Sequence, residues 1–86
     1  MSNQTLIKRL KYRSWHRGCK ETDLILGNFS ENELEKQNSA FLEVYETFLD
    51  ENDADIWAWL TDKYPPENPN YLPIIEILKV YGLASE

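Results

Sequence analysis

Apolar side chains recur at intervals of three and four residues along most of this chain, which is the spacing of one face of an α-helix. No segment of useful length alternates apolar and polar residues as a β-strand does, and no internal repeat or low-complexity tract occurs. At 86 residues, the chain can bury one modest hydrophobic core but not two. The sequence therefore predicts an all-α fold, a single domain over residues 1–86 built as a small bundle of about five short helices.

The first two helices are expected to form a tight hairpin. One should run from Asn3 to about His16, because Gly18 follows where a helix end commonly needs a left-handed backbone. The next, a short helix, should begin near Glu21 and break at Gly27-Asn28. In the first helix Leu6, Ile7 and Leu10 stand at helical spacing and continue towards Tyr12 and Trp15. The second is expected to run through Leu24, Ile25 and Leu26.

Capping signals mark the next two helices. The segment Ser30-Glu31-Asn32-Glu33 has the pattern of a capping box, so a third helix is expected to begin there and to carry an apolar stripe as far as Leu49. Asp53 is expected to cap a fourth helix, from Ala54 to about Lys63, which the two following prolines would end.

Prolines and tryptophans shape the last third of the chain. Pro73 suits the first turn of a last helix, which Gly82 is expected to close. Trp57 and Trp59 stand two residues apart and cannot share one helical face. One of them is therefore expected in the core and the other partly exposed.

Charge is divided unevenly along the chain. Residues 21–86 contain three basic and fifteen acidic residues, a net charge of −12, although the whole chain carries only −6. Two explanations are open: a surface for nucleic acid or another polyanion, or a cationic first helix that lies against the domain's own acidic residues. Residues 1–20 contain no acidic residue and six basic ones: Lys8, Arg9, Lys11, Arg13, Arg17 and Lys20.

Groups suited to catalysis are scarce. His16 and Cys19 are the only residues of their kinds, no third residue is placed to orient the histidine, and no glycine-rich phosphate loop occurs. The acidic stretch at residues 50–55 lacks the spacing and glycine of a calcium-binding EF-hand loop. The sequence therefore predicts a binding protein that is not an enzyme, with no metal site.

The same residues bear on the compartment. A single cysteine cannot form an intramolecular disulfide, which favours a reducing environment. No apolar signal segment precedes the first helix and no eighteen apolar residues run together, so no membrane insertion is expected. The expected location is a bacterial cytoplasm, or the mitochondrial matrix for a processed eukaryotic form.

One short motif carries a resemblance. The residues Arg17-Gly18-Cys19-Lys20-Glu21, followed by Asp23, form the pattern Arg-Gly-x-x-Glu-x-Asp, and Asp53-x-Asp55 leads into Trp59-Leu60 later in the chain. With Phe41-Leu42 between them, these elements resemble, in spacing and order, the SdhE/Sdh5 family of succinate dehydrogenase flavinylation factors. The resemblance spans nearly the whole chain. It departs at His16, where the family often has a second arginine.

The resemblance implies an assembly factor made of five helices. Such a factor binds the flavoprotein subunit of succinate dehydrogenase, or of the similar fumarate reductase, and promotes covalent attachment of FAD to a histidine of that subunit. The chain itself would bind no cofactor stably, and nucleic acid would not be its partner. The alternative, a polyanion-binding module that uses the basic first helix, stays open. The resemblance implies these partner-binding residues: His16, Arg17, Gly18, Glu21, Asp23 and Trp59.

Overall fold

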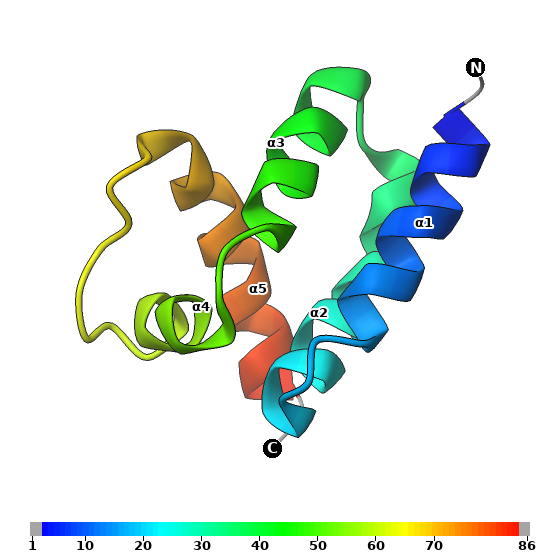
Figure 1. Cartoon of the computed structure of the whole chain (residues 1–86). Coiled ribbons are helices and arrows are strands. Elements are labelled where there is room, and N and C mark those ends of the chain that lie inside the picture. The colour runs from blue at the N-terminus through cyan, green and yellow to red at the C-terminus, as the bar shows by residue number, and fades with distance from the viewer. Residues whose placement is uncertain (1–2, 85–86) are drawn as a thin grey trace.

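A computed structural model describes residues 3–84, and within them every regular element is helical, which confirms the all-α prediction. Helices α1 and α2 run side by side in opposite directions, and α3, α4 and α5 complete the bundle around them (Figure 1). Two short 3₁₀ turns join the larger helices. The elements are α1 (Asn3–Trp15), α2 (Lys20–Glu33), η1 (Leu34–Lys36), α3 (Ser39–Leu49), α4 (Asp53–Leu60), η2 (Pro69–Tyr71) and α5 (Leu72–Ala84).

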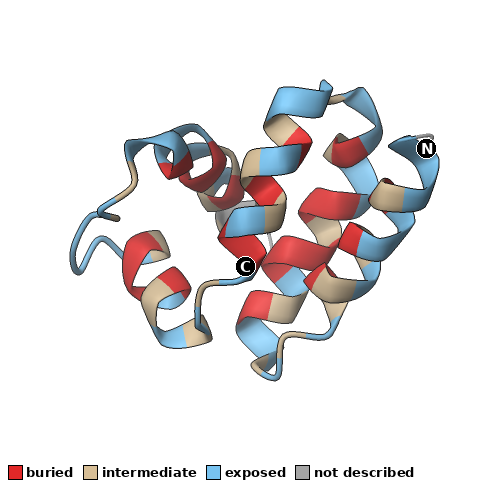
Figure 2. Cartoon of the chain, turned by 45° about the horizontal axis from the view of Figure 1, so that its top comes forward, coloured by how far each residue is buried: buried red, intermediate tan, exposed pale blue. Residues whose placement is uncertain are grey.

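The core draws apolar side chains from all five α-helices, and the buried stretches of the ribbon face inward in Figure 2. Aromatic rings bridge the helices within it: Phe29 lies 5.1 Å from Tyr45, and Phe48 lies 5.2 Å from Tyr71 in an edge-to-face arrangement, measured between ring centroids. The hydrophobic residues that are wholly inaccessible to water are Leu10, Leu26, Phe29, Leu34, Leu42, Tyr45, Phe48, Ile56 and Leu78.

Helix α2 does not break at Gly27-Asn28, so that prediction was wrong. Gly27 lies directly against the indole of Trp15, where an added Cβ would come within 2.2 Å of the ring. Because Gly27 has no side chain, α1 and α2 can approach each other closely here. This packing offsets the free-energy cost of a glycine in a helix interior. Asn28 continues the helix and donates a hydrogen bond to the carbonyl of Leu24 at 2.8 Å.

The capping box expected at Ser30 was also wrong. Ser30 is buried inside α2, and its hydroxyl donates to the carbonyl of Gly27 at 2.7 Å. The third helix begins later, at Ser39, where the side chain of Asn38 accepts a hydrogen bond from the backbone N–H of Phe41 at 2.9 Å. The capping-box pattern therefore does not start a helix here, because Ser30 is buried and its hydroxyl bonds within α2.

Four other helix ends differ from the prediction. Asn52, one residue before Asp53, caps α4 by accepting from the N–H of Asp55 at 2.8 Å. The helix ends at Leu60 and not near Lys63, since Asp62 takes a left-handed backbone with φ of 61°. Helix α5 continues through Gly82 to Ala84, whereas α1 ends at Trp15, one residue before the predicted end.

Within the described residues 3–84, no helix is both long enough and apolar enough to cross a membrane.

Candidate functional site

The connection between α1 and α2, residues 16–19, and the first turn of α2, residues 20–23, form a corner that we call the α1–α2 corner. Gly18 is exposed at its tip with φ of 97°, a conformation that side-chain-bearing residues rarely adopt. An added Cβ would meet only the carboxylate of Asp53, at 3.8 Å. Backbone conformation, and not lack of space, therefore requires glycine here, and the tip is open to a partner surface.

Arg17 holds this corner against the rest of the bundle. Its guanidinium donates hydrogen bonds to the backbone carbonyl of Leu49, the last residue of α3, and to that of Glu51, between α3 and α4. Its Nε donates to Asp53 at 3.1 Å. Only 11% of the side chain is exposed. A cation at a helix C-terminus satisfies carbonyls that lack partners within the helix and interacts favourably with the helix dipole. Arg17 thus ties the corner to the α3–α4 junction.

Asp23 fixes the corner from the other side. Its Oδ1 accepts a hydrogen bond from the backbone N–H of Arg17 at 2.6 Å, across the turn. Its own N–H donates to the carbonyl of Cys19 at 2.9 Å in the first turn of α2. An acidic residue in this position also suits the positive end of the helix dipole. Arg17 and Asp23, the first and last residues of the motif, therefore both form hydrogen bonds within the protein itself.

Glu21, by contrast, projects from the surface. It is exposed, and its Oε2 accepts a hydrogen bond from the thiol of Cys19 at 3.2 Å. That hydrogen bond, with a smaller contribution from a backbone N–H, lowers the pKa of the Glu21 carboxyl from its ordinary value. Glu21 therefore offers a fixed negative charge beside the open tip at Gly18.

His16 and two exposed apolar residues border the corner. His16 is exposed, and its imidazole packs against Tyr12 with ring centroids 4.2 Å apart and planes tilted by 33°. Tyr12 is 67% exposed, although the apolar spacing of the first helix continues towards it, and Leu24 is 43% exposed. Each stands two residues from a buried residue of the same helix, and residues two apart point to opposite sides of a helix. This spacing could have identified both side chains as exposed.

Trp59 does not lie at the corner. It is 7% exposed and packs between Phe48 and Tyr71, with ring centroids at 5.8 Å and 5.6 Å. Trp57 is 36% exposed, so the two tryptophans divide between core and surface as predicted. A direct role for Trp59 in binding stays a prediction.

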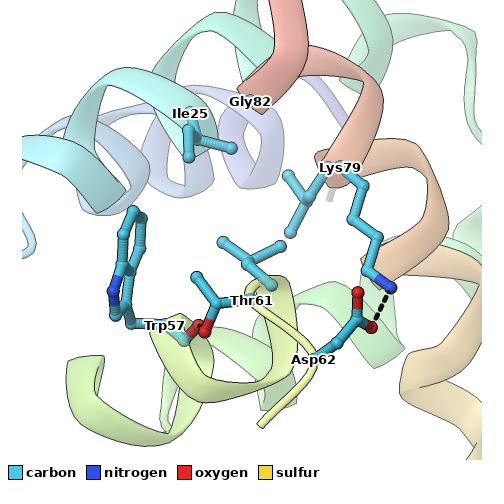
Figure 3. A pocket seen from close by; sticks show the side chains of 8 residues that line it. Ile25, Trp57, Thr61, Asp62, Lys79 and Gly82 are labelled. Carbon is cyan, nitrogen blue, oxygen red and sulfur yellow. Dashed lines mark hydrogen bonds and ion pairs between the residues drawn. The ribbon is translucent and has the colours of Figure 1, made fainter.

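Trp57 lines an apolar pocket of about 320 Å³ between α2, α4 and α5 (Figure 3). Ile25 points into this pocket from α2, and an ion pair between Lys79 and Asp62 closes its far rim.

The basic first helix finds its acidic partners within the bundle. Four of the six basic side chains of residues 1–20, three of them on α1, form ion pairs with acidic residues between Glu35 and Asp53, which favours the internal explanation of the charge asymmetry. Exposed pairs such as Arg9–Glu46 contribute little stability individually. The pairs are Arg9–Glu46 at 2.8 Å, Lys11–Glu35 at 3.1 Å, Arg13–Asp50 at 2.7 Å and Arg17–Asp53 at 3.1 Å.

A helical bundle with a rigid, exposed corner of fixed charge is typical of a small protein-binding domain. The chain belongs to the Sdh5 family, whose model is described as the flavinator of succinate dehydrogenase and matches residues 8–81.

Curated relatives are similar over most of this chain. The three described below are each named succinate dehydrogenase assembly factor 2, mitochondrial. The protein of Aspergillus flavus is 45% identical over 64 residues, covering 74% of this chain and 22% of its own length. The protein of Penicillium rubens is 42% identical over 81 residues, covering 90% of this chain and 26% of its own length. The protein of Schizosaccharomyces pombe is 35% identical over 81 residues, covering 93% of this chain and 58% of its own length. This chain thus spans about a fifth to three fifths of the length of these relatives.

Proposed function

We propose that this protein binds the flavoprotein subunit of succinate dehydrogenase, or of fumarate reductase, and promotes covalent attachment of FAD to that subunit. The observation that carries the proposal is membership of the flavinator family over residues 8–81. In this proposal the flavin and the histidine that it joins both belong to the client, and the chain holds no cofactor of its own. It acts in the compartment of its client, a bacterial cytoplasm or a mitochondrial matrix.

The α1–α2 corner supports this role as the docking surface. Gly18 has no side chain, so the client can approach the backbone closely. Glu21 supplies a charge that orients docking, and the internal hydrogen bonds of Arg17 and Asp23 keep the corner rigid. A rigid factor that holds two client domains in place can bring histidine and flavin together and so lower the barrier by positioning alone.

Binding to a purified client tests the docking surface. Glu21→Ala should weaken binding to the flavoprotein subunit about tenfold, the effect expected for one oriented charge pair at an interface. Glu31→Ala is a matched control, because Glu31 is also an exposed acidic residue of α2 but lies beyond the corner. Equal affinities for the two variants would remove the corner from the proposal.

Salt dependence tests the alternative, polyanion binding by α1. Lys8 and Lys20 are the two basic residues of the first twenty that form no ion pair within residues 3–84, and two charges are few for such a surface. We expect negligible binding to duplex DNA at physiological salt. Tight binding that falls steeply as salt rises would favour the alternative.

A further inference from the structure

The apolar pocket of Figure 3 has a buried inner wall and an accessible rim. Ile25 from α2 and Leu78 from α5 are buried and form the inner wall. Trp57 from α4 is 36% exposed, and Leu60 and Gly82, which also line the pocket, are half-buried. These last three residues present the surface that a ligand can reach, and the volume of about 320 Å³ has room for a large apolar side chain.

Gly82 is the one glycine of the chain whose lack of a side chain the fold does not require. Gly18 needs its positive φ, and Gly27 lies against the indole of Trp15. Gly82 lies within α5, where an added Cβ would meet Ile25 at 3.4 Å, an ordinary van der Waals distance. Glycine is unfavourable within a helix, so alanine would suit this position better. What a side chain here would take away is part of the pocket, since Gly82 lines it.

Two helices lead from the α1–α2 corner to the pocket. On α4, the carboxylate of Asp53 lies 3.8 Å from a Cβ built at Gly18, and Trp57 follows Asp53 by four residues. On α2, Glu21 projects at the corner, and Ile25 follows it by four residues. Residues four apart are neighbours on one face of a helix, with Cβ atoms about 5–6 Å apart. A partner segment that contacts Glu21 therefore lies within one helical turn of the pocket.

Charge indicates what accompanies an apolar group in this pocket. The carboxylate of Glu21 accepts a hydrogen bond from the thiol of Cys19 and forms no ion pair within residues 3–84. The charged residues of the pocket itself, Asp62 and Lys79, pair with each other at 2.5 Å. A basic residue of a partner is therefore favoured on the side of the pocket that faces the corner.

We propose that the pocket binds a large apolar side chain of the client flavoprotein subunit, from a segment that also carries a basic residue to pair with Glu21. This inference rests on the proposed function and extends its docking surface from the α1–α2 corner to α4 and α5. An apolar anchor in a preformed pocket supplies affinity, whereas the charge pair beside it orients docking. The exposed part of the Trp57 indole becomes buried in the complex.

Fluorine NMR of the full chain labelled with fluorotryptophan reports on the pocket. We expect the Trp57 signal to shift when the purified flavoprotein subunit is added, because the indole leaves water, while the signal of the core residue Trp59 stays in place. An unmoved Trp57 signal in a complex that Glu21→Ala still weakens would overturn the pocket and leave the corner in place. No binding of the wild-type chain to the subunit would instead refute the proposed function, and the pocket with it.

A second copy of this chain is the competing occupant. If it filled the pocket, the Trp57 signal would move as the concentration of the chain rises in the absence of the subunit. That result would overturn the proposal.

Variants of the pocket measure its contribution to affinity for the flavoprotein subunit. Trp57→Ala removes the exposed wall, and Gly82→Leu fills the space, because a leucine in a helix leans toward the preceding turn, here toward Leu78. Each should raise the dissociation constant about tenfold or more, as loss of an interface anchor does.

Val80→Ala is the matched control. It shortens an apolar residue of α5 that is 63% exposed and does not line the pocket, so it should leave the dissociation constant unchanged. A urea midpoint of Gly82→Leu near the wild-type value separates loss of the pocket from loss of the fold. Wild-type affinity in both pocket variants, or an equal loss in Val80→Ala, would overturn the proposal.

Discussion

Replacing Arg17 by alanine should destabilise the fold far more than removing any cation of α1. The guanidinium donates to the carbonyls of Leu49 and Glu51 and pairs with Asp53 while only 11% of the side chain is exposed. Charged hydrogen bonds of this kind contribute about 1.5–3 kcal/mol each, and the partly exposed ion pair adds about 0–1 kcal/mol. Water can replace part of these bonds in the variant, so we expect a loss of about 2–4 kcal/mol.

Urea unfolding followed by far-ultraviolet circular dichroism measures this loss. For a chain of this size the free energy of unfolding falls by about 1 kcal/mol per molar urea, so the midpoint should drop by about 2 M or more. Arg9→Ala is the control, because Arg9 is 55% exposed and its pair with Glu46 should contribute about 0–1 kcal/mol. If Arg17→Ala costs no more than Arg9→Ala, Arg17 does not hold the corner as described.

Three further outcomes follow from individual contacts. Gly27→Ala should destabilise the protein by about 1–3 kcal/mol in urea unfolding, because the new Cβ overlaps the indole of Trp15. This loss should exceed the gain from the better helix propensity of alanine. A neutral or stabilising effect would contradict the described packing of Gly27 on Trp15. Burial, and then a hydrogen bond to Glu33, raise the pKa of Tyr81 to about 12 from an unfolded value of 10.0. The contribution of the neutral Tyr81 phenol to folding stability is therefore complete below pH 10.0 and is lost as pH rises through about 12. Over that range the urea midpoint of Tyr81→Phe should fall less than that of the wild-type protein. Equal falls would show that Tyr81 is not the group responsible. Cys19→Ala should raise the pKa of the Glu21 carboxyl toward its ordinary value in an NMR titration, and an unchanged pKa would show that the thiol is not the cause.

Helix content could be predicted from apolar spacing, but several helix ends could not. Gly27 and Ser30 carry the local signals of a helix end and a helix start, yet both lie inside α2. Packing between helices decides these positions: the indole of Trp15 needs a neighbour without a Cβ, and the Ser30 hydroxyl is satisfied by a carbonyl of its own helix. Such contacts join residues that a local pattern does not relate.

The α1–α2 corner could be located from its motif, but the division of labour within it could not. The sequence placed Arg17 and Glu21 together as charges flanking Gly18. In the structure, Arg17 reaches Leu49 and Glu51, more than thirty residues away, while Glu21 stays at the surface. Only the tertiary fold separates the charge that stabilises the corner from the charge that is available to a partner.

Covalent flavin on the client tests the central claim most directly. The flavoprotein subunit is co-expressed with no factor, with the wild-type chain, with Glu21→Ala or with Glu31→Ala, and flavin fluorescence is read in a denaturing gel, which retains only covalently bound flavin. We predict that fluorescence rises with the wild-type chain and with Glu31→Ala and falls with Glu21→Ala. Fluorescence that is the same in all four samples would contradict the proposed function for this client.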